Sequence, residues 1–342
     1  MRGGTSVGSG EEKAELNADK LPSHANAGIL RHCGTDWRAK LIRTRTVSGV
    51  GAGLLIALLF PGAVFAANPS DPSHETGGPG QGGIIALSPA DQALQSAKEQ
   101  LANEHAAVMA GTADAATFDQ HWQAFLREYA PGATSNLTPA SAVVGGASPL
   151  LTSNSLSLSQ HAQTQSYYCG PASAYSMLYY KFPGTTGPAG ESLTQAHLAA
   201  YGSGYLDTDY YGNTPWSPAV TAPALNAWGH TSFWVTFSSP SLTTYESELT
   251  TDVDGGWPIA VGVYEEANTS TPHLTGHPTN IIIEHWVAVH GYTSSGANST
   301  YADSVYGATS VSWYQDVTSP HSTISSSNMR TMMIQGGYGF VS

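Results

Sequence analysis

The stretch from Asn280 to Tyr292, "NIIIEHWVAVHGY", restricts the fold of this chain more than any other part of the sequence. It is long and largely apolar, with many β-branched residues, so it predicts a strand that is buried inside a sheet. Two histidines, His285 and His290, interrupt this apolar run. A polar histidine inside a buried strand is either a hydrogen-bonded structural residue or part of a catalytic site.

Strand alternation separates these two histidines. His285 shares one face with Val287 and Val289, whereas His290 lies on the opposite face with Trp286. They therefore cannot both point toward one neighbouring side chain, and at most one of them serves a given catalytic group.

The segments around this strand divide into a helical part followed by a run of strands, which is an α+β pattern. Helices are predicted from residue 169 onward and at 192–201, 222–228 and 242–249. Strands are predicted at 231–237, 258–265, 280–292, 311–315 and 331–341.

An additional helical hairpin is predicted at 88–131. Its second helix carries a stripe of aromatic residues that must be buried against another surface. The stripe consists of Phe118, Trp122, Phe125 and Tyr129, with Leu126 beside it. Two interpretations remain open, simple docking onto the main domain and an inhibitory pro-segment laid over an active site.

The first 66 residues resemble a targeting segment rather than part of a fold. Arg43 and Arg45 precede an apolar run from Val50 to Phe60, and small residues follow up to Ala66. This layout predicts a secretory signal peptide cleaved after Ala66 and an extracellular protein. The apolar run is too short for an ordinary membrane span. The polar leader before Arg43 is long, which leaves a start codon downstream of Met1 open.

Two polar stretches connect these parts of the chain. Residues 67–87, which include "TGGPGQGG", are predicted to form a flexible linker, and residues 132–155 a polar connector. The main domain is expected over residues 156–342.

Charge and cysteine content narrow the possible functions. The chain beyond Ala66 has only four basic residues and 20 acidic ones, which gives a formal net charge of 4 − 20 = −16. Such a surface repels nucleic acid and anionic membranes, so neither is expected as a partner. Cys33 lies in the leader, so Cys169 is the only thiol expected after cleavage.

Cys169 stands at the start of a predicted helix, within "QTQSYYCGPASAYSMLYYKF". A thiol is nucleophilic as the thiolate, and a helix N-terminus lowers the pKa of a thiol because its amides favour negative charge. A histidine partner would complete an ion pair, and His285 is the candidate.

Two further residues complete this candidate site. Asp303, 18 residues after His285, is expected to accept a hydrogen bond from the imidazole and orient it. Gln163, six residues before Cys169, is expected to donate its amide to the oxyanion of a tetrahedral intermediate, with Gln165 as a local competitor. An ordinary turn aspartate is the alternative reading of Asp303.

The motifs "Q-x5-CGPAS", "HWVAVHGY" and "YADS" together resemble the papain-like cysteine peptidases, and most closely their family thirty-nine, which contains the double-glycine bacteriocin-leader peptidases. The resemblance covers roughly residues 156–342. It implies a papain-like fold in which the nucleophile helix packs on a C-terminal antiparallel sheet. It also implies that Cys169 attacks, His285 acts as the base, Asp303 orients it and Gln163 forms the oxyanion hole.

By this resemblance the protein is a secreted cysteine peptidase that acts on a peptide or protein and needs no metal or organic cofactor. Two alternatives remain open. One is acyl transfer or amide hydrolysis on the same fold, because "QTQSYYCG" also resembles phytochelatin synthases. The other is a binding module that has lost catalysis.

Two metal-like patterns are set aside. His273 and His277 form H-x-x-x-H in a Thr/Pro/Gly-rich stretch, without the helix and the glutamate of a zinc peptidase motif. The stretch "DTDYYGN" at 207–213 begins like a calcium loop, but Tyr211 occupies a ligand position.

Overall fold

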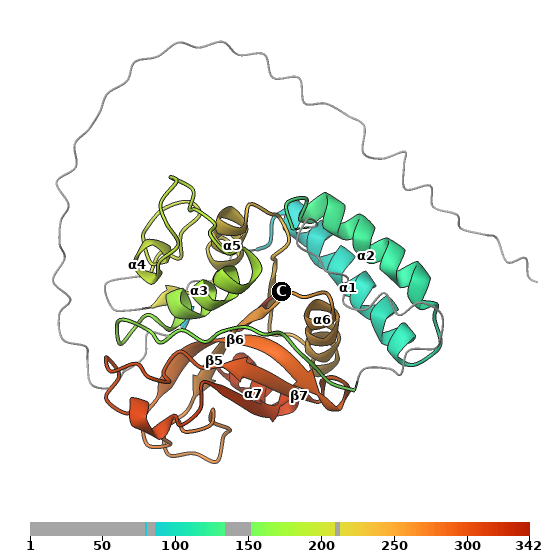
Figure 1. Ribbon diagram of the computed structural model, residues 1–342. Helices are drawn as coiled ribbons and strands as arrows, with labels where there is room; N and C mark the ends of the chain where they lie inside the picture. Colours follow the sequence, from blue (N-terminus) through green and yellow to red (C-terminus); the bar gives the residue numbers. More distant parts are fainter. Residues whose placement is uncertain (1–78, 81–85, 134–151, 209–212) are drawn as a thin grey trace, which may run out of the picture. The chain divides into compact units, whose positions relative to one another are not determined.

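The computed structural model describes residues 79–80, 86–133, 152–208 and 213–342 (Figure 1). All of them lie within one unit, Phe65–Ser342. The leader predicted over 1–66 lies outside the described residues, as do most of the linker at 67–87 and most of the connector at 132–155.

An antiparallel sheet is built around β6 (Ile283–Thr293), the strand that the sequence predicts to be buried. Ten of its eleven residues are buried. The strand order along the main path is β4-β9-β5-β6-β7-β8, and β2 pairs with the end of β6 beyond β5. The strands of this sheet are β2 (Asn154–Ser155), β4 (Thr236–Ser238), β5 (Ile259–Glu265), β6, β7 (Asn298–Ala302), β8 (His321–Ser325) and β9 (Gly339–Val341). Separately, β1 (Pro79–Gly80) pairs in parallel with β3 (Thr214–Pro215).

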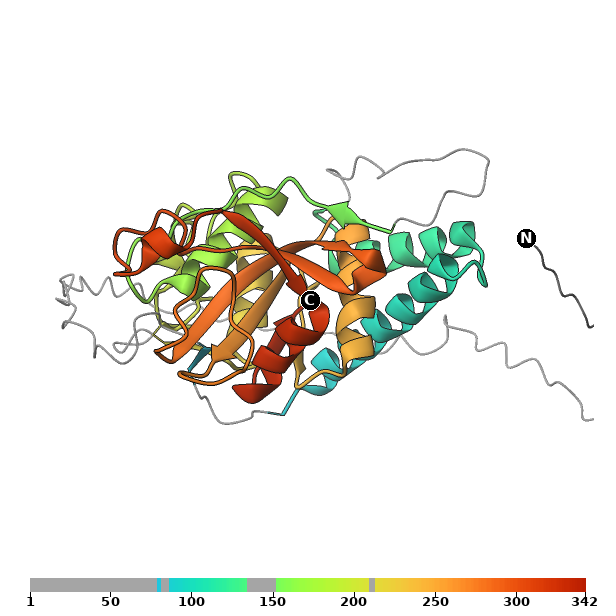
Figure 2. The same ribbon diagram turned by 90° about the horizontal axis from the view of Figure 1, so that it is seen from below.

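Helices pack around this sheet, so the predicted α+β class is confirmed (Figures 1 and 2). Helix α3 packs against β6, α6 against α1 and β6, and α7 against β5 and β7. The helices are α1 (Pro89–Met109), α2 (Ala115–Tyr129), α3 (Cys169–Lys181), α4 (Gln195–Leu198), α5 (Thr221–Gly229), α6 (Leu242–Asp254) and α7 (Ser326–Gln335). None of the helices in the described ranges is both long and apolar enough to cross a membrane.

Three strand predictions are wrong in whole or in part. Of the strand expected at 231–237, only Thr236 and Phe237 belong to a strand, β4. Residues 311–315 lie in an irregular segment that leads into a short 3-10 helix at Tyr314–Asp316. Their alternating pattern arises because Val311 and Trp313 point into a small hydrophobic cluster beside the sheet. Residues 331–335 belong to α7, whose buried methionines follow helical spacing: Met329, Met332 and Met333.

The helical hairpin α1–α2 adds to the same hydrophobic core as the sheet. Ser88 caps α1 by accepting a hydrogen bond from the amide of Asp91 at 3.1 Å. From α2, Trp122 and Phe125 pack edge-on against Phe233, with ring centroids 6.2 and 5.9 Å away. Within the aromatic stripe, Trp122 and Phe125 are thus buried in the domain core, and Phe118 and Tyr129 are half-buried against it. An inhibitory role for the hairpin stays a prediction.

A buried ion pair fixes the hairpin to α6. The Lys98 ammonium lies 2.9 Å from Asp252 Oδ1, with both side chains about 1% exposed. It also lies 3.6 Å from the centre of the Phe233 ring. Beside it, burial raises the pKa of Glu248 to about 8, although the charge of Lys98 lowers it. Lys98 therefore balances the buried charge of Asp252, whereas Glu248 is mostly protonated at neutral pH.

We expect Lys98→Met to lower the free energy of unfolding by about 3–5 kcal/mol, because Asp252 would then be a buried charge without its partner. Urea denaturation of the full chain measures this change. Arg127→Met, on the exposed surface of α2, is the matched control and should change stability by less than about 0.5 kcal/mol. Equal losses in the two variants would contradict the role given to Lys98.

Candidate active site

Cys169 is the first residue of α3 and is completely buried. No side chain caps this helix: Tyr168 occupies the N-cap position without a side-chain hydrogen bond. The helix N-terminus therefore directs its partial positive charge at the Cys169 side chain. Gly170 allows β3 to approach closely, since a Cβ at this position would overlap the side chain of Thr214.

His285 reaches the site from β6, and strand register decides what lies beside it. In the pairing of β5 with β6, Val263 is opposite His285; in that of β6 with β7, Tyr301 is opposite Val289. Side chains two residues apart share a face. Asp303, two residues beyond Tyr301, therefore continues on the face of the sheet that carries His285.

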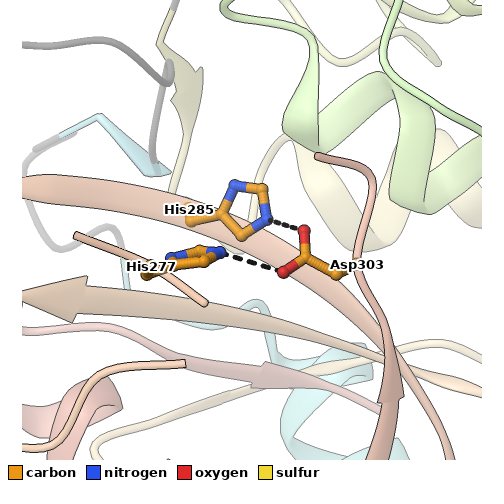
Figure 3. A group of neighbouring side chains, drawn as sticks. All are labelled: His277, His285 and Asp303. Carbon is orange, nitrogen blue, oxygen red and sulfur yellow. Dashed lines mark hydrogen bonds and ion pairs between the residues drawn. The ribbon is translucent and has the colours of Figure 1, made fainter. Parts of the chain in front are cut away.

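Cys169, His285 and Asp303 lie together in the structure. His285 Nε2 lies 3.1 Å from Asp303 Oδ1 (Figure 3). This bond orients the ring. The other ring nitrogen, Nδ1, is buried and has no hydrogen-bond partner among the nitrogen and oxygen atoms of the described residues. The Cys169 side chain interacts with the same imidazole. The thiol thus contacts the imidazole, and the imidazole contacts the carboxylate.

Electrostatics within the site favour a charged imidazole. Burial alone would lower the pKa of His285, but the hydrogen bond and charge of Asp303, together with Cys169, raise it to about 9. Burial alone would raise the pKa of Asp303, yet the neighbouring histidines hold it well below its ordinary value. Asp303 is therefore ionised, and an imidazolium at His285 is stabilised near neutral pH.

Gln163 is buried just upstream of Cys169, but its amide is engaged elsewhere. Its Nε2 donates to the carbonyl oxygens of Gln165 and Ser166 at 3.0 and 2.8 Å. Its Oε1 accepts from the Ser304 hydroxyl at 3.0 Å. Gln163 thus shapes the loop before Cys169 in this structure, and at least one of its amide hydrogens would have to be redirected to reach an oxyanion. Gln165 itself is exposed.

Two residues that the sequence does not single out for this site, His277 and Glu265, also belong to it. His277 Nε2 lies 2.9 Å from Asp303 Oδ2, and its Nδ1 lies 2.7 Å from Glu265 Oε1. All three side chains have at most 2% of their surface exposed. Figure 3 shows His277 and His285 each bonded to a different oxygen of Asp303.

The strand pattern of the sequence could have predicted that Glu265 lies near His285. Glu265 ends β5 two residues after Val263, which pairs with His285, so it falls on the same face as His285. His277 offers no such signal, because it lies in an irregular segment between β5 and β6. Its proximity to Asp303 is set by tertiary structure alone.

The other candidate positions lie outside this cluster. His290 is buried on the opposite face of β6, where its Nδ1 lies 3.1 Å from the Leu156 carbonyl and its Nε2 lies 3.0 Å from His321. His273 lies 3.0 Å from the Thr271 carbonyl through Nδ1. The central part of the stretch at 207–213 lies outside the described residues.

Among the described residues, His277, His285 and Asp303 form one group whose potential metal-ligand atoms lie within 4.8 Å of one another. Asp303 oxygens already accept hydrogen bonds from both rings, and His277 is bonded at its second nitrogen as well. Hydrogen bonds to carboxylate oxygens thus already occupy both ring nitrogens of His277 and Nε2 of His285.

A comparison with models of protein families gives a match. Residues 156–323 match the model of a family described as the Peptidase_C39 like family. The match includes Cys169, Glu265, His277, His285 and Asp303 and excludes the α1–α2 hairpin. A search of the curated proteins found no match to the chain.

We expect Gly170→Ala to lower the free energy of unfolding by about 1–3 kcal/mol, because the added methyl group would overlap Thr214 in a well-packed site. Thermal or urea denaturation measures the change. Gly132→Ala is the control, since a Cβ there meets no atom within 4 Å. If both variants are equally stable, the close approach of β3 to α3 is not a constraint.

Proposed function

Through residues 156–323 the protein belongs to the Peptidase_C39 like family, and from this premise we propose that it is an exported cysteine peptidase that hydrolyses peptide bonds. Its papain-like α+β fold joins the helix that carries Cys169 to the antiparallel sheet that carries His285. The observation that best supports the proposal is that Cys169, His285 and Asp303 are buried together, with His285 in contact with both of the others.

The first half of the proposed reaction acylates the thiol. The Cys169 thiolate attacks the carbonyl carbon of the substrate, a C–S bond forms, and the carbonyl oxygen becomes an oxyanion. The intermediate then collapses, the C–N bond breaks, and the His285 imidazolium transfers its proton to the leaving amine. Asp303 keeps the imidazole oriented through Nε2, so Nδ1 is the nitrogen left to exchange protons with the thiol and the leaving group.

The second half releases the acyl group. Neutral His285 takes a proton from a water molecule, and the resulting hydroxide adds to the thioester carbonyl. The C–S bond then breaks to give a carboxylic acid and the original thiolate–imidazolium pair. We assign oxyanion stabilisation to the Cys169 amide at the start of α3 and to Gln163, whose side chain must first release the carbonyl oxygens of Gln165 and Ser166.

Burial of the site implies a step before chemistry. Cys169 and His285 have no exposed surface, so covering residues must move before a peptide reaches the thiol. The release of Gln163 from the loop that precedes Cys169 is one such movement. The expected substrate is a peptide or protein, met outside the cell.

We expect an irreversible peptide-based thiol probe to label Cys169 in the full chain carrying Cys33→Ala, in which Cys169 is the sole thiol. In this background His285→Ala should slow labelling at pH 7 by about 100-fold or more, because it removes the base that activates the thiol. Mass spectrometry of the labelled protein measures the rate, and Cys169→Ala is the blank.

His121→Ala is the matched control, since His121 is an exposed histidine of α2. Labelling at the same rate without His285 would contradict the activated thiol. A folded protein that no thiol-directed electrophile labels would instead favour a binding module that has lost catalysis. Incubation of a cleaved peptide with added amines then separates hydrolysis from acyl transfer.

A further inference from the structure

The strongest feature outside the three residues of the proposed reaction is the environment of His277. Both of its ring nitrogens lie within hydrogen-bond distance of carboxylate oxygens, Glu265 Oε1 at 2.7 Å and Asp303 Oδ2 at 2.9 Å. An ionised carboxylate can only accept a hydrogen bond. Both nitrogens of His277 must therefore donate, which makes the ring an imidazolium.

Charge balance supports the same assignment. Two carboxylates, Glu265 and Asp303, are buried here, and an uncompensated buried charge is costly. A cation between them removes this cost. Burial by itself would lower the pKa of His277, but the charges of Glu265 and Asp303 outweigh it and raise this pKa to about 10.

Further contacts hold Glu265, His277 and Asp303 in place. Glu265 Oε2 accepts from the Leu274 amide at 3.3 Å, and Asp303 Oδ1 accepts from the Val305 amide at 2.9 Å. The ring of Trp313 packs edge-on against His277 with centroids 4.7 Å apart. The other titratable groups that face this pocket are His285, whose ring centroid is 5.2 Å from that of His277, and Tyr301. Burial keeps Tyr301 neutral by raising its pKa to about 12.

We propose that Glu265 and His277 are positioning residues: a charged His277, clamped by Glu265, holds the Asp303 carboxylate in the orientation that aligns His285 with Cys169. This inference rests on the proposed function and extends its site by two residues. Asp303 uses one oxygen for each histidine, so a rotation of the carboxylate would break both bonds. His277 therefore acts through Asp303 and does not touch the substrate.

The protonation state is tested first, without any activity measurement. In the full chain labelled with ¹⁵N-histidine, NMR at pH 8 should show both ring nitrogens of His277 protonated, with His277→Gln assigning the signals. A single protonated nitrogen would overturn the proposal. Signals that change after dialysis against a chelator would also overturn it, because a metal ion would then occupy the place of a proton.

The second test is the pH dependence of Cys169 labelling by the peptide-based probe, in the Cys33→Ala background. His277→Gln keeps an amide donor but removes the cation. Loss of a nearby positive charge makes proton release from the thiol and imidazole less favourable, so the pH midpoint of labelling should rise by on the order of one unit. The maximal rate should fall by up to about 100-fold because Asp303 is less well held.

Glu265→Gln removes a negative charge and should shift the midpoint in the opposite direction, to lower pH. The double variant Glu265→Gln with His277→Gln removes one charge of each sign and should return the midpoint toward that of the parent protein. His121→Gln is the matched control, since His121 forms an exposed pair with Glu104 at 2.7 Å and should leave the profile unchanged.

Circular dichroism and urea denaturation show whether each variant is folded. A His277→Gln protein that is folded and less stable, yet keeps the parent pH profile and labelling rate, would reduce His277 to a structural residue and overturn the proposal. Failure of the proposed function gives a different result, in which the parent protein itself is not labelled at Cys169.

Discussion

The pairing of β6 with its two neighbours is the constraint on which the rest of the structure depends. Antiparallel registers on both sides place Glu265, His285 and Asp303 on one face of the sheet, although they come from three different segments. Because side chains alternate along a strand, a slip of one residue in either pairing would turn one carboxylate to the opposite face. The burial of β6 specifies this register, since a slip would also turn its apolar residues outward.

Charge alternation is the second principle of the site. Proceeding from the nucleophile, a thiolate, an imidazolium, a carboxylate, a second imidazolium and a second carboxylate follow one another in the proposed reactive state. Each charge is buried next to an opposite one, where electrostatic interactions are stronger than in water. Where the α1–α2 hairpin meets α6, the buried charge of Asp252 is likewise paired with an opposite charge, that of Lys98.

Much of this arrangement could be predicted from local patterns. The apolar run around His285 identifies a buried strand, and the pattern at 88–131 identifies a helical hairpin; both are present. Prediction failed where a local pattern has two physical causes. Val311 and Trp313 alternate like strand residues because they fill a hydrophobic cluster, and Met332 and Met333 are apolar because they lie on the buried side of a helix. It also missed His277, because an irregular segment carries no periodicity.

The sequence by itself determined the chemistry that is available. It supplied one thiol beyond the leader, at a helix start, a histidine in a buried strand and an aspartate 18 residues later. These features follow from local propensity and from motif resemblance. Only the tertiary structure decided which groups meet: it engaged the amide of Gln163 with the loop before Cys169, and it placed His277 between Glu265 and Asp303. The physical reason is that His277 lies 26 residues from Asp303, and Gln163 lies 141 residues from the Ser304 hydroxyl that binds its amide oxygen, so only the packing of the whole domain brings these groups together.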